Sequence, residues 1–388
     1  MKDYLNNKFI ETFHETPEGF LSCGGRFEVL GNHTDHNHGL CIAATCSLAI
    51  YGAYKKRDDK IISIMSEGYP LFNIKINDLR KKNREIGRSS ALLRGIAYYL
   101  SSLGYQYGGI TIYLKSMIPS GAGVSSSAAF ELIIAQMYNI IFNEGKIPLI
   151  DLCKASQFAE REYYGKMCGL LDQIGVAYGG LTCIDFADIN NPKIESLKPE
   201  FNGYHFVIVN SGGDHSSLSH LYAAIPQDMF KVANYFNKKF LREISKDELL
   251  QNKEKIILKC GSKAYQRALH FFEENERVIK AKTAIKENDI PSLINLINES
   301  RISSTEYLEN MCVDNIKEGS PLEACELIML ASHNKAGVKI NGGGFAGSVI
   351  ALIPDDELDN VTNVAGEKYG KNNVHVVSVR NEQPSVIK

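Results

Sequence analysis

The feature that most constrains this chain is a run of glycines and serines, PSGAGVSSSAAFE, at residues 119–131. It follows an alternating apolar segment at residues 110–114 and leads into an apolar pattern of helical period, which predicts a strand, a loop and a helix. Small residues let the backbone approach a bulky anion, and the free N–H groups at a helix start favour phosphate oxygens. We therefore predict a phosphate site here, in preference to an ordinary turn with a serine N-cap. No lysine precedes the serines, so neutralising charge must come from Mg²⁺ and from elsewhere in the chain.

A second polar segment, GRFEVLGNHTDHNHG, spans residues 25–39. Its histidines and aspartate leave three interpretations open. Imidazole and carboxylate suit Zn or Fe, so a metal site is chemically possible. The same side chains suit the vicinal hydroxyls of a sugar, because a carboxylate accepts two O–H groups while an imidazole orients a third. A solvated turn is the remaining interpretation.

A third glycine-rich segment, KINGGGFAGS, spans residues 339–348 and precedes the apolar run at 349–353. Glycines between two apolar segments are typical of a tight hairpin. In a chain that already has a phosphate loop, such a turn can instead pack beneath that loop or close the active site. Both interpretations stay open from the residues alone.

The rest of the chain alternates strand-like and helix-like segments in its first half and is richer in amphipathic helices in its second, which predicts an α+β protein. We expect strands at residues 47–54, 61–65, 110–114 and 205–209, and helices that follow Ser125, Ile147 and Ser217. The lysine-rich segment 238–259 is expected to be a solvated helical excursion. With 388 residues the chain is long enough for two domains, which we place at residues 1–200 and 201–388.

The balance of charge argues against two classes of partner. Lysine plus arginine number 43 against 45 aspartate plus glutamate, and this net charge of -2 gives no electrostatic reason to bind nucleic acid or an anionic membrane. The segment MKDYLNNKFIETFHE lacks the apolar stretch of a signal peptide, and the most apolar stretch, residues 132–142, is too short to cross a bilayer. Nine cysteines without CxxC pairing suit reduced thiols. We therefore expect a cytoplasmic protein without disulfides, a monomer or weak homodimer that binds small molecules.

Together these segments resemble the motifs of the galactokinases, which are GHMP small-molecule kinases. GGRFEVLGNHTDHNHG is similar to the galactokinase signature, PSGAGVSSSAAFE to the family's phosphate loop and NGGGFAGS to its third glycine motif, in the same order. Residues 159–173 resemble the segment that supplies a Mg²⁺ ligand and the catalytic aspartate. The resemblance implies a two-domain GHMP kinase fold, with an α/β N-terminal domain like that of a ribosomal protein, a ferredoxin-like α+β C-terminal domain, and the active site in the cleft between them.

The resemblance also implies an activity, the transfer of phosphate from ATP, with Mg²⁺, to the anomeric hydroxyl of galactose. Asp172 would be the catalytic carboxylate, and Arg26 would keep it ionised and stabilise developing charge. Ser127 and Glu160 would hold Mg²⁺, which prefers oxygen ligands. The residues implied to contact the nucleotide are Gly121, Ala122, Gly123, Val124, Ser125, Ser126 and Ser127. Those implied to contact the sugar are Asn32, His33, Asp35, Gly169 and Tyr222, the last in the segment HSSLSHLY at residues 215–222.

One further carboxylate stands close to the predicted metal ligands. Glu131 follows Ser127 by one helical turn and lies on the same face of the predicted helix. It either supports the site or forms a surface ion pair.

One departure from the family bears on substrate identity: galactokinases carry Glu where this chain has Asn32. Other departures, among them Glu28 where the family has Asn, delete no catalytic group. The family's Glu, with the histidine that follows it, accepts the hydrogen bond from the sugar's 6-hydroxyl. The change at position 32 removes one negative charge. The lost charge-assisted hydrogen bond would weaken galactose binding by about 1 to 2 kcal/mol, and an asparagine does not repel a carboxylate at carbon 6. Galacturonate and L-arabinose, which lacks carbon 6, are therefore alternative substrates.

Two other classes of function stay open. The first is a galactose and ATP sensor that does not turn its ligands over, and the second is a metal hydrolase built on the histidine-rich loop. The catalytic and metal-binding residues implied by the resemblance are all present, which favours an enzyme over a sensor. A hydrolase would leave the phosphate loop without a function.

Overall fold

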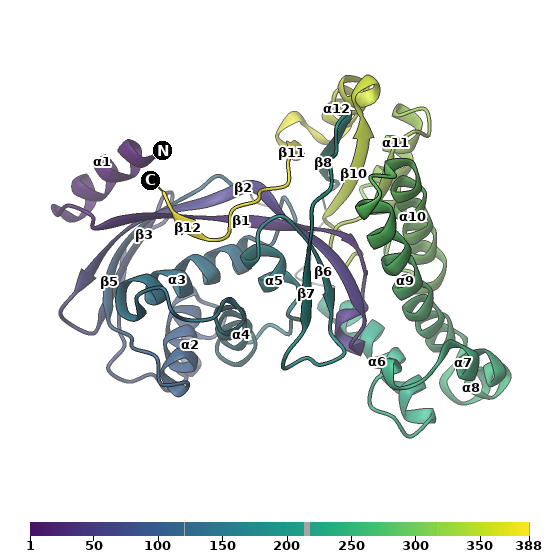
Figure 1. The fold of residues 1–388 in the computed structure, drawn as a ribbon, viewed down its shortest axis with the longest axis horizontal. Helices are drawn as coiled ribbons and strands as arrows, with labels where there is room; N and C mark the ends of the chain where they lie inside the picture. Colours follow the sequence, from purple (N-terminus) through teal and green to yellow (C-terminus); the bar gives the residue numbers. More distant parts are fainter. Residues whose placement is uncertain (120, 213–217, 315, 388) are drawn as a thin grey trace.

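The computed structural model describes residues 1–119, 121–212, 218–314 and 316–387. Within these residues the chain forms an eight-stranded and a four-stranded β-sheet, each packed with helices (Figure 1). None of the described helices is long and apolar enough to cross a membrane. The α+β fold class predicted from the sequence is confirmed.

The large sheet is built around two long antiparallel strands, β1 and β2, paired from Gly19 with Tyr54 to Leu30 with Ile42. Its strands are β1 (Gly19–Leu30), β2 (Leu40–Arg57), β3 (Ile61–Ser66), β4 (Phe72–Lys75), β5 (Gly109–Ser116), β6 (Leu181–Asp185), β7 (Lys193–Leu197) and β12 (Ser385–Val386). Their order is β12-β1-β2-β5-β3-β4, and β6 pairs with both β2 and β7. The strands predicted from apolar alternation are confirmed as parts of β2, β3 and β5.

The helices of the first half are α1 (Lys2–Phe13), α2 (Ser89–Ser102), α3 (Ser126–Asn143), α4 (Leu149–Phe158) and α5 (Leu171–Ala177). Of these, α2 to α5 lie together on one face of the large sheet (Figure 1). The predicted helices after Ser125 and Ile147 are confirmed as α3 and α4. A π-helical turn, Ala159–Tyr164, follows α4 directly, and such widened turns occur frequently at functional sites.

The small sheet contains β8 (Tyr204–Asn210), β9 (Gly337–Ile340), β10 (Ser348–Pro354) and β11 (Val374–Val377). All of its pairs are antiparallel, in the order β11-β8-β10-β9. Helices join β8 to β9 and β10 to β11, which makes this the split β-α-β arrangement of a ferredoxin-like sheet. The strand predicted at residues 205–209 and the ferredoxin-like C-terminal half are both confirmed.

The helices of the second half are α6 (Ser219–Tyr235), α7 (Lys246–Gln251), α8 (Lys253–Cys260), α9 (Ser262–Lys286), α10 (Ile290–Ser303), α11 (Pro321–Ala331) and α12 (Asp355–Tyr369). The helix predicted after Ser217 is α6, although Ser217 itself lies outside the described residues. The lysine-rich segment is helical as predicted and forms α7 and α8. A capping box between Ser245 and Glu248 starts α7, because each side chain bonds the backbone N–H of the other.

The end of the chain returns to the large sheet. The small sheet begins at Tyr204, near the predicted boundary at residue 200, but β12 pairs with β1 and the N–H of Arg380 donates to the carbonyl of Thr45 at 2.8 Å. This return is the yellow segment beside β1 in Figure 1. The division at 200 therefore remains a proposal, and a cut at that point would separate β12 from its partner strand.

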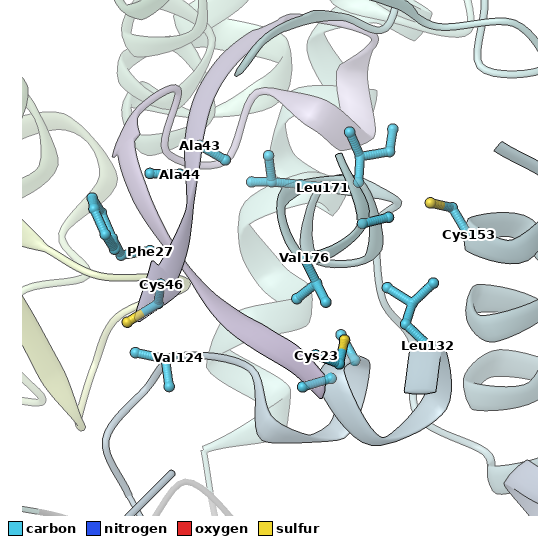
Figure 2. Close-up of a cluster of buried hydrophobic side chains, with 14 of the residues drawn as sticks. Cys23, Phe27, Ala43, Ala44, Cys46, Val124, Leu132, Cys153, Leu171 and Val176 are labelled. Carbon is cyan, nitrogen blue, oxygen red and sulfur yellow. The ribbon is translucent and has the colours of Figure 1, made fainter. Parts of the chain in front are cut away.

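One part of the hydrophobic core anchors the phosphate loop. Figure 2 shows buried side chains that converge from β1, β2, the phosphate loop and three helices: Cys23, Phe27, Ala43, Ala44, Cys46, Val124, Leu132, Cys153, Leu171 and Val176. Val124 is buried, and its carbonyl accepts a hydrogen bond of 2.9 Å from the backbone N–H of Arg26. The loop and β1 are thus held together by both apolar packing and a backbone hydrogen bond.

Candidate active site

A partly buried ion pair joins the first strand to a short helix. Arg26 on β1 donates from Nε to Asp172 Oδ1 at 2.7 Å and from Nη1 to the carbonyl of Gly123 at 2.9 Å. Asp172 stands in the first turn of α5, and Ser125 Oγ donates to its other oxygen at 2.5 Å. Burial by itself would raise the pKa of Asp172, but the charge of Arg26 and the hydrogen bonds hold it below its ordinary value. An ionised carboxylate next to a phosphate loop can orient a hydroxyl nucleophile and accept its proton.

The phosphate loop alternates between buried and open positions. Ala122 and Val124 are buried among the core side chains, while Gly121, Gly123 and Ser126 are exposed. Gly123 has a φ of +71°, and a Cβ there would lie 1.7 Å from Ser348 Oγ. Glycine is therefore required at position 123 both by the backbone conformation and by the close neighbour. The anchoring residues hold a loop whose glycines present their backbone to solvent.

The third glycine segment packs beneath this loop. It connects β9 to β10 as a hairpin, and Asn341 at its start donates from Nδ2 to the carbonyl of Gly123 at 3.1 Å. The Oδ1 of Asn341 accepts a hydrogen bond of 3.0 Å from the backbone N–H of Glu28. Both interpretations of the segment are therefore correct, because it is a hairpin and it also supports the phosphate loop.

The two predicted metal ligands meet at the start of α3. Ser127 Oγ donates to Glu160 Oε1 at 3.2 Å, and Lys166 Nζ donates to the same oxygen at 2.7 Å. Glu160 lies in the π-helical turn, which places its carboxylate opposite the first turn of α3. A hydroxyl and a carboxylate form the kind of oxygen donor set that Mg²⁺ prefers.

A second carboxylate lies behind Glu160. Gln173 donates from Nε2 to Glu160 Oε2 and to Glu131 Oε2, each at 3.2 Å. Glu131 is 0% exposed, and burial followed by the charge of Glu160 raises its pKa well above the ordinary value. Glu131 is therefore a buried carboxyl and forms no surface ion pair with the described residues. Its Oε1 and the Oε1 of Gln173 have no hydrogen-bond partner among the described residues, which leaves two buried oxygens beside the predicted metal ligands.

The histidine-rich loop presents a carboxylate toward α5. Asp35 Oδ1 accepts the N–H of His36 at 2.9 Å, and a Cβ added to Gly169 would lie 1.8 Å from Asp35 Oδ2. Gly169 lies just before α5, and its lack of a side chain leaves room for this carboxylate. Burial, together with the charges of Asp172 and Glu28, raises the pKa of Asp35 to about 7. The pKa of Asp172 is thus lowered and that of Asp35 is raised, which suits different roles toward a hydroxylated ligand.

His33 and Tyr222 form one wall of the same site. Their ring centroids are 5.0 Å apart, and His33 Nε2 donates to the carbonyl of Gly343 at 2.8 Å. Burial lowers the pKa of His33 to about 4, so the ring is neutral at physiological pH. Tyr222 reaches the loop from α6, and a Cβ at Gly343 would collide with its ring. The tyrosine is 45% exposed, so it is open to a ligand on its outer side.

Asn32, by contrast, uses its side chain within the protein. Its Nδ2 donates to Glu28 Oε1 at 3.2 Å and to the carbonyl of Gly342 at 2.7 Å, and its Oδ1 accepts from Asn310 Nδ2 at 2.9 Å. The residue is 1% exposed. Glu28 also accepts a hydrogen bond of 2.8 Å from the fully buried Lys339. The negative charge missing at position 32 is therefore present four residues earlier, in direct contact with Asn32.

Residues of α9 that the sequence analysis did not single out hold the histidine-rich loop in place. Glu274 accepts the backbone N–H groups of Gly31 and Asn32 at 2.9 and 3.3 Å. His270 Nε2 donates to the carbonyl of Asn32 at 2.9 Å, and Asn275 Oδ1 accepts the N–H of Leu40 at 2.7 Å. We call His270, Glu274 and Asn275 the loop clamp. The only sequence signal for it was a histidine and a glutamate four residues apart, on a helix face that also carries Arg267 and Arg277.

The metal interpretation of the histidine-rich loop finds no geometric support. Among the described residues, no three histidine, cysteine, aspartate or glutamate side chains are grouped so that they could hold a metal ion. His33 and His36 instead contact each other, with 3.2 Å between Nδ1 and Nε2. Except for the inward-turned Asn32, the predicted catalytic, metal and sugar residues gather around Arg26 and Asp172, and their roles stay predictions.

Comparisons with known proteins identify similar motifs and a similar fold. The galactokinase galactose-binding signature matches residues 7–56, and the GHMP kinases N terminal domain matches residues 91–180. The chain is 29% identical over 378 residues to a galactokinase of Limosilactobacillus fermentum, covering 94% of this chain and 93% of the relative. It is 28% identical over 372 residues to a galactokinase of Clostridium tetani, covering 95% of this chain and 92% of the relative.

Two solved structures share the fold. The Lactococcus lactis galactokinase complexed with galactose matches with a TM-score of 0.84 and 23% identity, covering 100% of both chains. The Methanococcus jannaschii mevalonate kinase matches with a TM-score of 0.65 and 16% identity, covering 93% of this chain and 98% of the other. The two-sheet architecture is thus common to kinases of different small molecules.

Proposed function

The chain belongs to the GHMP kinase family, and we propose that it is a galactokinase, which transfers the γ-phosphoryl group of ATP to the anomeric hydroxyl of galactose. The product is galactose 1-phosphate. The observation that carries the proposal is the partly buried pair of Arg26 and Asp172, in direct contact with Gly123 and Ser125 of the phosphate loop. Asp172, which would bind the sugar hydroxyl, therefore lies directly beside the loop that would bind the triphosphate of ATP.

The reaction needs positioning and charge stabilisation more than covalent help from the protein. The anomeric oxygen forms a bond to the γ-phosphorus, and the bond from that phosphorus to the bridging oxygen of ADP breaks. Asp172, kept ionised by Arg26, orients the hydroxyl and accepts its proton. Arg26 is held by its bonds to Asp172 and Gly123, so its charge needs no rearrangement as the transition state forms.

Ser127 and Glu160 are proposed to hold Mg²⁺. Their oxygens lie together at the start of α3, and the unpartnered oxygens of Glu131 and Gln173 lie behind them. When bound there, Mg²⁺ neutralises charge on the phosphate oxygens. The two proposed ligands both offer oxygen, which this ion prefers.

Galactose is the proposed sugar because the curated relatives are galactokinases. Asp35, Gly169, His33 and Tyr222 would face the sugar hydroxyls. Glu28, which contacts Asn32, is paired with Lys339, so it adds no net negative charge near carbon 6 of the sugar. Galacturonate and L-arabinose, which lacks carbon 6, therefore stay as the alternatives. We retain the predictions of a cytoplasmic location and of a monomer or weak homodimer.

The test is a comparison of specificity constants for ATP-dependent phosphorylation of D-galactose, D-galacturonate and L-arabinose. We expect galactose to exceed galacturonate by at least about tenfold, a factor that one buried polar partner of the substrate can produce. Asp172→Asn should reduce turnover of galactose by about 10³-fold or more while it still binds the sugar. A preference for galacturonate or arabinose would overturn the choice of sugar. Galactose and ATP binding without turnover in the unmodified protein would instead identify a sensor.

A further inference from the structure

The phosphate loop of this chain contains no lysine, so the positive charge facing a triphosphate has to come from other segments. Arg26 is one source, but its guanidinium is already bonded to Asp172 and to the carbonyl of Gly123. Lys339 is fully buried and paired with Glu28, which removes it from contact with a ligand. Neither cation is free to follow a transferring phosphoryl group.

Lys166 differs from both in its position. It lies in the segment between the π-helical turn and α5, directly after Gly165, where φ is +95°. Its Nζ donates to Glu160 Oε1 at 2.7 Å, the same oxygen that accepts from Ser127. The ammonium therefore occupies the side of Glu160 on which the predicted metal ligands converge.

The exposed fractions of the Lys166 and Glu160 side chains show which of the two faces solvent. The side chain of Lys166 is 56% exposed, whereas that of Glu160 is 4% exposed. The lysine thus stands on the solvent side of a buried carboxylate, from which a ligand has to arrive. A pair with one partner this exposed contributes little to folding stability, so stability gives no reason for a lysine here. Its positive charge also acts on Asp172 and helps to keep the pKa of that carboxyl low.

We propose that Lys166 is a mobile phosphate-contacting cation of this centre, which pairs with Glu160 in the free protein and binds the γ-phosphate of ATP once a divalent ion takes Glu160. The proposal rests on the proposed use of ATP at this site. Glu160 Oε1 cannot serve an ammonium and a divalent ion equally, because the two positive charges repel each other. The incoming phosphate offers the displaced ammonium new oxygens at short range. The lysine that the phosphate loop lacks is then supplied from the segment before Asp172.

Binding of two probes tests this without turnover. Calorimetry measures the affinity for a non-hydrolysable ATP analogue with Mg²⁺, and electron paramagnetic resonance measures Mn²⁺ binding to the nucleotide-free protein. We expect Lys166→Met to weaken analogue binding by about tenfold, the usual effect of one lost hydrogen bond to a charged group. It should tighten Mn²⁺ binding, because Glu160 loses its competing ammonium. Lys166→Arg should recover most of the analogue affinity.

The matched control is Lys154→Met on α4, where the lysine bonds the carbonyl of Asn190 away from the site. It should leave both affinities unchanged. Analogue affinity of Lys166→Met within about twofold of the unmodified protein would overturn the proposal and reduce Lys166 to a surface ion pair. Weaker Mn²⁺ binding in Lys166→Met would also overturn it, because competition for Glu160 would be excluded. If the unmodified protein phosphorylates no sugar, the proposed function fails, while the two affinities still decide the role of Lys166.

Discussion

Two groups of buried polar side chains flank the Arg26–Asp172 pair, and they satisfy their hydrogen bonds to different degrees. In the loop clamp, Glu274 accepts bonds from Gly31, Asn32, Ser300 and Arg277, so that both of its oxygens have partners. In the second group, which we call the carboxylate cluster, Glu131, Glu160 and Gln173 share one amide. That cluster leaves two buried oxygens without a partner among the described residues.

The difference indicates that the loop clamp holds the backbone in place, whereas the carboxylate cluster has oxygens available for a ligand. A carboxylate with all of its partners in place fixes the loop that carries His33 and Asp35, and its removal leaves buried donors unsatisfied. Buried oxygens without a hydrogen-bond partner are costly unless a ligand satisfies them. We therefore expect changes in the loop clamp to act mainly on stability, and loss of the charge of Glu160 in the carboxylate cluster to act mainly on activity.

The largest effect is expected for Glu274→Gln. Glu274 is fully buried, and although burial would raise its pKa, Arg277 and further partners lower it to about 2. Removal of the charge leaves Arg277 without its closest partner, which should cost about 3 to 5 kcal/mol in the free energy of unfolding. Urea unfolding measures this cost. The control is Glu273→Gln, a neighbour only 3.8 Å from Arg277 and partly exposed, which should change stability by less than about 1 kcal/mol.

The same residue predicts a dependence on pH. Because the pKa of Glu274 in the folded protein lies below its ordinary value of 4.5, its contribution to stability is complete above that value. The contribution is lost as pH falls from 4.5 toward 2. The unmodified protein should therefore lose its stability advantage over Glu274→Gln across that range. Equal stability of the two proteins at neutral pH would contradict the role of the loop clamp.

An effect of intermediate size, on activity rather than on stability, is expected for Glu160→Gln. The amide keeps the shape of the side chain but removes the charge that would hold a divalent ion, so kcat should fall by about 100-fold. Thermal unfolding should move little, since the ion pair with Lys166 is exposed on one side. Glu162→Gln in the same π-helical turn is the control and should keep normal activity. A loss of stability as large as that of Glu274→Gln would remove the distinction between the two groups.

The smallest effect is expected for Glu131→Gln. Because burial and the charge of Glu160 raise the pKa of this carboxyl well above its ordinary value and so disfavour its charged form, we expect an uncharged amide of the same shape to replace it with little loss. Activity should stay within about twofold, and stability within about 1 kcal/mol, of the unmodified protein. Steady-state kinetics and urea unfolding provide both numbers. A 100-fold loss of activity would mean that Glu131 is charged and binds the metal directly.

Most secondary structure near the site could be predicted because it depends on local patterns. Apolar alternation marked β2, β3, β5 and β8, and the small residues before an apolar run marked the start of α3. The hairpin at residues 339–348 could also be predicted, but its position beneath Gly123 could not. That contact joins segments more than 200 residues apart, and no local pattern encodes such a distance.

The residues of the site could be predicted where they lie in segments that resemble the motifs of a known family. Arg26, Asp172, Ser127 and Glu160 were singled out from the resemblance of their segments, and the structure brings them together. Lys166 was missed because a lone lysine in a loop has many ordinary explanations. Asn32 was judged in isolation as the loss of a charge, whereas in the fold it contacts the carboxylate of Glu28.

The sequence by itself determined the local conditions: a glycine at position 123 where a Cβ has no room, serines at a helix start, and apolar periods that define strands and helices. Only the tertiary structure decided which polar groups share a partner. Through packing between distant elements, Glu274 reaches the backbone of the histidine-rich loop, and the pKa of Glu131 is raised beside Glu160. The physical reason is that backbone preference and amphipathic period act over a few residues, whereas hydrogen-bond satisfaction and pKa depend on every group that packing brings within a few ångströms.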